Sequence, residues 1–201
     1  MQTIDSKLIS RIYGKKRGWA FSPRDFMDLG NGKAVSKALQ TLCDGGQIRR
    51  LARGLYDYPQ VHPQLGLLLP TPDAIAHALA GKDSLRIQPS GAYAANLLGL
   101  SLQVPARVVF LTDGTDRKIQ IGNQEIILKR TTPKNMATAG RVSGLVIQAL
   151  RHLGKDHVDV EVIQKLNAKL TDDDRRTLMK DIKLAPAWIG NIIRRLATGR
   201  A

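Results

Sequence analysis

An amphipathic helix pattern, followed at once by a glycine pair and an arginine-rich hairpin pattern, constrains this chain more than any other feature. From Lys33 to Cys43, apolar residues recur three and four positions apart, which predicts one buried stripe on a helix: Val35, Ala38, Leu39 and Leu42. Gly45-Gly46 predicts the end of that helix, because glycine accepts the left-handed backbone conformation found after helices. Gln47–Leu51 and Leu55–Tyr58 have the composition of two strands, joined by a tight reversal at residues 52–54.

The outward side of this helix and the tip of the hairpin are polar and cationic. Opposite its apolar stripe the helix carries Lys33, Ser36, Lys37 and Gln40, and the hairpin carries Arg49, Arg50 and Arg53. A helix of this kind can enter the major groove of double-stranded DNA while the hairpin reaches the flanking phosphates. We therefore expect the four helix residues to face the major groove and the three arginines to clamp the backbone, with Arg53 able to enter the minor groove.

The residues before this helix complete a recognisable order of elements. Residues 5–13 are predicted to form a first helix, capped by Asp5 or Ser6, and residues 19–21 a short apolar strand. A second, short helix is predicted over residues 23–27, with Ser22 as its N-cap and a proline at its first position. The order helix, strand, helix, turn, helix, hairpin is that of a winged helix-turn-helix domain, here residues 1–60.

Further cations lie close to these elements in the sequence. Arg24 stands near the start of the second helix, and a basic turn precedes the strand: Lys15, Lys16 and Arg17. We expect them to add phosphate contacts. The alternative for the basic turn is an ordinary solvated loop, and winged helices in general also serve as protein-binding modules.

The Gly-rich turn, the helix and the segment Arg-Arg-Leu-Ala-Arg-Gly-Leu-Tyr at residues 49–56 resemble the N-terminal domain of AbiEi-type antitoxins. The DUF6088 proteins are similar, and are the closer of the two. The resemblance covers residues 5–60 and is looser beyond. It implies the antitoxin of a bacterial abortive-infection toxin–antitoxin pair, whose N-terminal domain binds the promoter of its own operon, with inverted repeats as an expected target. It also implies a nucleotidyltransferase-like toxin as partner, neutralised with or without direct contact.

The charge balance agrees with a polyanionic partner. The chain has 201 residues with 31 Lys+Arg and 17 Asp+Glu, a formal net charge of +14. Nucleic acid is the expected partner of such a surface, although ribosomal and membrane-surface proteins share this composition. Residues 64–133 carry 7 basic and 5 acidic side chains, whereas residues 1–63 carry 11 and 5 and residues 134–201 carry 13 and 7. The excess is therefore concentrated in the two ends of the chain.

Beyond residue 60 the pattern predicts an α+β protein overall. Residues 61–70 have the proline content of a linker, residues 71–133 alternate helix and strand patterns as a small α+β domain, and residues 134–201 form a helical subdomain. Within the middle domain, the Gly122-Asn123 dipeptide predicts a hairpin. Residues 71–201 together would correspond to the antitoxin-like part of the chain.

No group of residues predicts an active site, a metal site or a cofactor. The run Asp172–Asp174 follows Thr171, which favours helix capping over metal binding, since carboxylates suit the first turn of a helix. Asp113 and Asp116 flank a glycine turn and are predicted to serve that turn. Ser90-Gly91 can cap a helix or meet a phosphate, and capping is favoured. The four histidines have no metal-ligand spacing, so we expect a protein that is not an enzyme.

Three alternative functions stay open at this level. The middle and C-terminal residues could form a toxin-binding module that acts by direct contact. An RNA-binding protein is disfavoured by an aromatic content of 4%, which leaves few rings for base stacking. A carboxylate nuclease would have only weak sequence signals.

A single cysteine, Cys43, and no apolar run of membrane-spanning length predict a cytoplasmic protein with no membrane partner.

Overall fold

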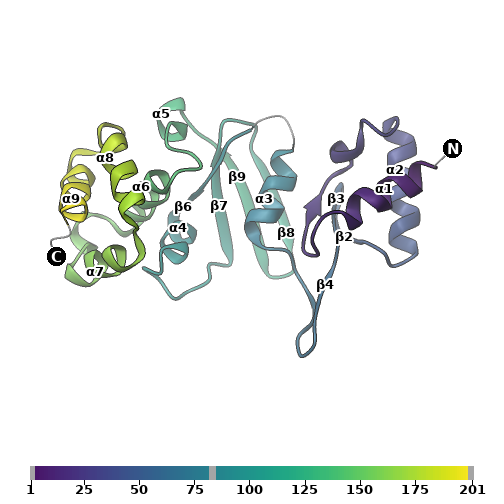
Figure 1. Cartoon of the computed structure of the whole chain (residues 1–201), viewed down its shortest axis with the longest axis horizontal. Helices are drawn as coiled ribbons and strands as arrows, with labels where there is room; N and C mark the ends of the chain where they lie inside the picture. Colours follow the sequence, from purple (N-terminus) through teal and green to yellow (C-terminus); the bar gives the residue numbers. More distant parts are fainter. Residues whose placement is uncertain (1–2, 82–84, 199–201) are drawn as a thin grey trace. The chain divides into compact units, whose positions relative to one another are not determined.

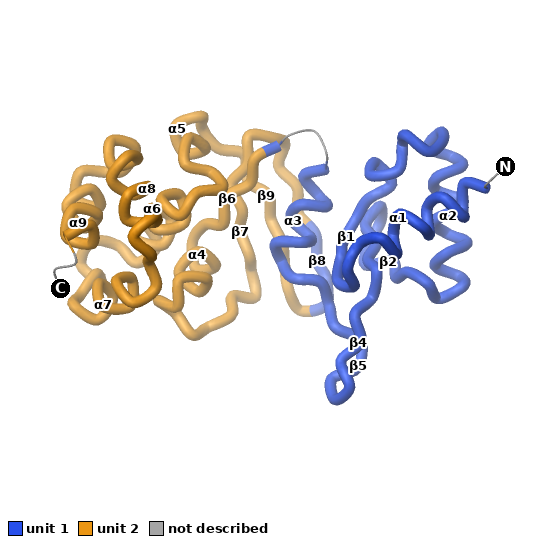
Figure 2. The backbone as a smooth tube through the Cα atoms, in the orientation of Figure 1, with its two compact units in different colours: residues 1–85, 119–122 blue, residues 86–118, 123–201 orange. Residues whose placement is uncertain are grey.

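The computed structural model of the chain describes residues 3–81 and 85–198. It mixes helices and strands, which confirms the predicted α+β class. The chain divides into two compact units, Met1–Leu85 with Ile119–Gly122, and Arg86–Lys118 with Asn123–Ala201 (Figure 2). The first unit thus takes in the segment expected to be a linker and the helix that follows it.

The first unit begins with helices packed on a small antiparallel sheet (Figure 1). Its elements are α1 (Ile4–Tyr13), β1 (Ala20–Phe21), the 3-10 helix η1 (Pro23–Phe26), α2 (Gly32–Asp44), β2 (Arg49–Ala52) and β3 (Leu55–Asp57). The three strands pair in the order β1-β3-β2. One apolar cluster holds helices and sheet together, with fully buried side chains from each: Leu8, Ile12, Phe21, Phe26, Val35 and Leu39.

Two local predictions in this segment were wrong in detail. The first helix is capped by Thr3, whose Oγ1 accepts a hydrogen bond from the Ser6 backbone N–H, and not by Asp5 or Ser6. The second helix is a 3-10 turn of four residues. It is closed by Asp25, whose carboxylate accepts hydrogen bonds from both the backbone N–H and the hydroxyl of Ser22. Ser22 as N-cap and the proline at the first position are as predicted, and the helix ends at Phe26 with Met27 as its C-cap.

Residues 60–68 form a two-stranded hairpin that the sequence pattern did not reveal. Strand β4 (Gln60–His62) pairs antiparallel with β5 (Gly66–Leu68). Proline content suggested a linker, but Pro59 and Pro63 lie just outside β4, where a missing N–H costs no ladder hydrogen bond. Helix α3 (Pro72–Ala80) follows, capped by Thr71 as the sequence predicts, and packs beside β1.

After α3 the chain forms a four-stranded sheet and a helical cluster, which belong to the second unit except for residues 119–121 of the sheet, which fall in the first. The strands are β6 (Ile87–Ser90), β7 (Arg107–Thr112), β8 (Arg117–Ile121) and β9 (Gln124–Arg130), in the order β6-β7-β9-β8. The helices are α4 (Gly91–Leu97), α5 (Pro133–Met136), α6 (Val142–Leu153), α7 (Val160–Lys169), α8 (Asp172–Asp181) and α9 (Ala187–Ala197), with 3-10 turns η2 (Lys155–His157) and η3 (Ile182–Leu184). Side chains of α4, α6, α7, α8 and α9 share one core.

Candidate nucleic-acid interface

Helix α2 is positioned by its apolar stripe and by its N-cap. Asn31 Oδ1 accepts a hydrogen bond of 2.9 Å from the Ala34 backbone N–H, which satisfies one of the free donors of the first turn. The predicted stripe is buried in full: Val35, Ala38, Leu39 and Leu42. Because this stripe fixes the rotation of the helix, the opposite face must be solvent-exposed.

That exposed face carries the four residues predicted from the sequence. Lys33, Ser36 and Lys37 are exposed, and within the described chain neither lysine ammonium group has an ion-pair or hydrogen-bond partner. Gln40 is exposed but donates from Nε2 to Asp44 Oδ1 at 2.8 Å. Asp44 was not among the predicted residues, and its carboxylate makes the C-terminal end of this face less cationic than the N-terminal end.

The β2–β3 hairpin presents two of its three arginines to solvent. Arg50 and Arg53 are exposed, and no partner is found for either among the residues described. Arg53 and Gly54 form the turn, where Gly54 has a φ of +73° that suits glycine. The ladder is irregular, since Arg50 pairs with Tyr56 whereas Ala52 pairs with Leu55. Leu51 is thus an extra residue on β2.

The third arginine, Arg49, is only partly exposed and forms an ion pair within the protein. Its Nε and Nη2 donate to the two carboxylate oxygens of Asp57, at 3.0 and 2.6 Å, and Asp57 has no exposed side-chain surface. Nη2 also donates to the Leu68 carbonyl at 2.7 Å. These bonds join β2 to β3 and to β5. To contact a DNA backbone as expected, the Arg49 side chain would have to give up its ion pair with the buried Asp57 carboxylate.

Among the cations of the basic turn and Arg24, as among the hairpin arginines, some are exposed with no side-chain partner among the described residues, and others are engaged within the chain. Lys16 is exposed. Lys15 Nζ lies 5.7 Å from the centroid of the Trp19 ring, and the Arg17 guanidinium lies 4.6 Å from that of Tyr58. Arg17 Nη1 also donates to the Pro59 carbonyl at 2.8 Å. Arg24 is exposed and already engaged within the chain. Two of these four cations, Lys15 and Arg17, are therefore held against aromatic rings.

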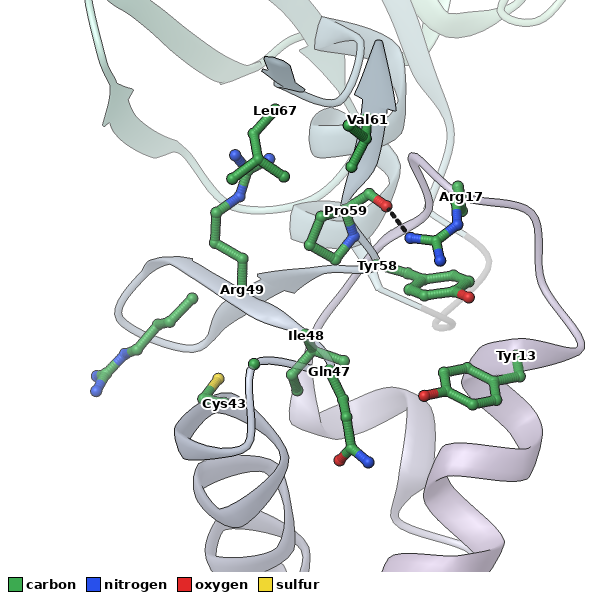
Figure 3. Close-up of a pocket in the computed structure, with 12 residues that line it drawn as sticks. Tyr13, Arg17, Cys43, Gln47, Ile48, Arg49, Tyr58, Pro59, Val61 and Leu67 are labelled. Atoms are coloured by element: carbon green, nitrogen blue, oxygen red, sulfur yellow. Dashed lines mark hydrogen bonds between the residues drawn. The ribbon is translucent and has the colours of Figure 1, made fainter. Parts of the chain in front are cut away.

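A cavity of about 590 Å³ lies beside β2 and was not anticipated from the sequence (Figure 3). Its lining mixes aromatic, cationic and apolar side chains: Tyr13, Arg17, Cys43, Gln47, Ile48, Arg49, Arg50, Tyr58, Pro59, Val61 and Leu67. Burial raises the pKa of the Cys43 thiol, and the neighbouring Asp44 carboxylate adds to this rise. A thiol held protonated in this way is a poor nucleophile.

Of the other groups singled out in the sequence, only Thr171 and Asp174 have the expected role. Ser90 makes no side-chain capping hydrogen bond with α4, because its hydroxyl donates to Gln148 Oε1 at 3.2 Å, and Asp113 and Asp116 bond Arg86 and Arg130, which lie outside their own turn. Thr171 and Asp174 form the predicted capping box of α8. The Asp113 carboxylate accepts hydrogen bonds from the backbone N–H and Nε of Arg86, and this side-chain bond lowers the pKa of Asp113. Asp116 accepts from the Arg130 backbone N–H. Residues 3–81 and 85–198 contain no cluster of His, Cys, Asp or Glu that could hold a metal ion.

The first unit thus defines an α+β protein that presents a cationic helix face and an arginine-bearing hairpin. Residues 7–178 match DUF6088, a family of unknown function, and the chain belongs to this family. The predicted similarity to DUF6088 proteins is confirmed. No curated protein and no solved structure matches the chain. Across the described ranges, no helix has both the length and the apolar character needed to cross a membrane.

Proposed function

We propose that residues 3–58 act as a winged helix-turn-helix domain that binds double-stranded DNA. In this proposal α2 enters the major groove and the β2–β3 hairpin is the wing. One observation carries the proposal: the exposed face of α2 and the hairpin hold four cations, Lys33, Lys37, Arg50 and Arg53, without partners in the described chain. Cations left unpaired on a helix and its adjoining hairpin suit phosphates and base edges.

Arg49 has a different part in this proposal from the one expected of it. Since its Nε and Nη2 already donate to Asp57 and Leu68, it would hold the wing in shape rather than contact DNA. Arg50 and Arg53 would meet the backbone, and Lys37 would contact a base or a phosphate. Lys16 would add a phosphate contact from the basic turn.

Fluorescence anisotropy tests the proposal, using the duplex just upstream of the gene and a shuffled duplex of equal composition over a range of salt. Specific recognition predicts a preference for the upstream duplex that persists near physiological salt. Equal binding to both duplexes that collapses with salt would mean that the net charge produces only non-specific attraction.

Lys37→Ala refines this test. If Lys37 meets only phosphate, affinity should fall alike for both duplexes and the salt slope should drop by about one. If it contacts a base, discrimination should fall by about 1–3 kcal/mol. Lys155→Ala is the matched control, because it removes another exposed lysine, one that belongs to the second unit. Unchanged affinity and slope for Lys37→Ala would remove this residue from the interface.

The same proposal includes autorepression and an antitoxin role, both supported by the resemblance of residues 5–60 to AbiEi-type antitoxins. Production of the neighbouring gene product should arrest growth, and co-production of this chain should restore it. Failure to restore growth would contradict the antitoxin role without touching DNA binding. A Lys37→Ala variant that restores growth would separate neutralisation from repression, and co-purification would show whether the two proteins bind directly.

A further inference from the structure

The β4–β5 hairpin is an uncharged element on a strongly cationic chain. Residues 58–72 contain no Lys, Arg, Asp or Glu, whereas the whole chain has a formal net charge of +14. Figure 2 shows the hairpin projecting from the rest of its own unit. Because two copies of a cationic chain repel each other over most of their surface, a neutral projection is where they can approach most closely.

One face of the hairpin is apolar and open to solvent. Val61 and Leu67 are register partners, so their side chains lie on the same face of the two strands, and they are 60% and 59% exposed. Leu65, in the turn, is 73% exposed. Val61 and Leu67 also line the cavity beside β2, together with Tyr58 and Pro59 (Figure 3). The cavity lining includes Arg17, Arg49 and Arg50 as well, so the face without formal charge is confined to the hairpin itself. Adjacent exposed apolar side chains of this size mark an interaction surface.

The hairpin is held in place rather than left loose. At its base, Arg17 Nη1 donates to the Pro59 carbonyl and Arg49 Nη2 to the Leu68 carbonyl. At its tip, His62 Nδ1 accepts from the backbone N–H groups of Gln64 and Leu65, and Gly66 takes a φ of +71°. An isolated two-stranded hairpin is marginal in water, so these anchors keep an apolar face and two open strand edges presented to solvent.

We propose that this surface binds a second copy of the same chain, with the two β4–β5 hairpins facing each other across a twofold axis. A twofold contact needs a patch that complements itself. The apolar face of the hairpin, whose own residues carry no Lys, Arg, Asp or Glu, meets this condition, and an open strand edge can pair antiparallel with its own copy. An acidic partner would instead be drawn to the cationic surfaces elsewhere on the chain. The inference does not depend on DNA binding.

Sedimentation equilibrium of the full chain tests the proposal. The mass should rise from 22.1 kDa towards twice that value with increasing concentration. Added salt should strengthen the pairing, because it screens the repulsion between like charges. DNA binding should respond to salt in the opposite direction, so failure of one proposal is distinguishable from failure of the other.

Variants locate the contact. Leu65→Lys/Leu67→Lys should keep the chain at its monomer mass, and Leu65→Ser, which lies outside both strands, should weaken pairing without disturbing their register. Leu102→Lys/Val104→Lys is the control, since both residues are exposed and apolar but belong to the second unit. A wild-type chain that stays monomeric would overturn the proposal. So would pairing that survives in both hairpin variants, or that is lost equally in the control.

Discussion

The buried carboxylate of Asp57 decides the role of Arg49 at the residue scale. A buried charge is costly unless paired, and the bidentate bond from Arg49 supplies the pairing. Replacing Arg49 with Met should therefore lower the free energy of unfolding by about 3 kcal/mol, the lower end of what breaking a buried pair costs, because the Arg49 side chain is 25% exposed. Urea unfolding measures this loss as a lower midpoint at constant slope.

Arg50 supplies the control for this measurement. It lies next to Arg49 on the same strand but is exposed, and no partner for it is found in the described ranges, so Arg50→Met should change stability by less than about 0.5 kcal/mol. Equal losses in the two variants would show that the pair with Asp57 contributes nothing beyond general charge.

A second prediction at this scale concerns the reactivity of Cys43. Burial raises the pKa of its thiol, so less thiolate is present at any given pH than in an unfolded chain. Alkylation by iodoacetamide near pH 8 should be slower in the folded protein than in the urea-unfolded protein, and should accelerate as the pH rises further. A time course by mass spectrometry gives both rates. Equal rates at the same pH would contradict the raised pKa.

At the scale of elements, the tight packing around Gly144 in α6 predicts that even an added methyl group there is destabilising. A Cβ added to Gly144 would lie 2.4 Å from the Thr138 carbonyl oxygen and 2.4 Å from Gln88 Oε1. The carbonyl belongs to the backbone and cannot rotate away. Although alanine is the better helix former by about 1 kcal/mol, overpacking should prevail, and Gly144→Ala should lose about 1–3 kcal/mol of stability.

Gly190 in α9 provides the matched comparison. It is also a buried helical glycine, but a Cβ there would meet Ile182 Cγ1 at 3.6 Å, an ordinary contact. Gly190→Ala should therefore be neutral or stabilising by up to about 1 kcal/mol. Thermal unfolding of the two variants gives the comparison directly, and a loss of stability at Gly190 as large as that at Gly144 would show that the clash is not the cause.

The elements also show what local sequence could and could not predict. Helix α2 and its stripe follow from periodicity, and the cap of α8 follows from Thr171 and Asp174. Strand order does not, because β7 pairs in parallel with β9 while β8 lies at the edge, and this depends on long-range packing. The β4–β5 hairpin was missed because Pro59 and Pro63 suggested a linker.

In the candidate site, one extra residue in β2 decides which arginine is exposed, and local sequence does not predict it. A regular ladder from the Arg53-Gly54 turn would put Arg50 opposite Asp57. The extra residue Leu51 shifts the register, so Arg49 pairs with Asp57 and Arg50 becomes exposed. The sequence identifies the arginines of the hairpin, but the bulge decides which of them is available to a ligand.

At the scale of the whole molecule, net charge and a specific site make competing predictions. The cationic excess is shared by the two ends of the chain, residues 1–63 and 134–201, so any polyanion should be attracted to both. A DNA-binding wing confined to the first unit would instead make the arginines of that unit matter more than equally exposed arginines elsewhere.

Two charge-matched double variants separate these possibilities. Arg50→Gln/Arg53→Gln and Arg194→Gln/Arg195→Gln each lower the formal net charge of +14 by two, and all four side chains are exposed. If the wing contacts phosphates, the first variant should weaken binding to the upstream duplex and reduce the salt slope by about two, while the second leaves both nearly unchanged. Anisotropy titrations at several salt concentrations give the slopes. Equal losses in both variants would mean that total charge, and not the hairpin, accounts for binding, because the position of the removed charges would then make no difference.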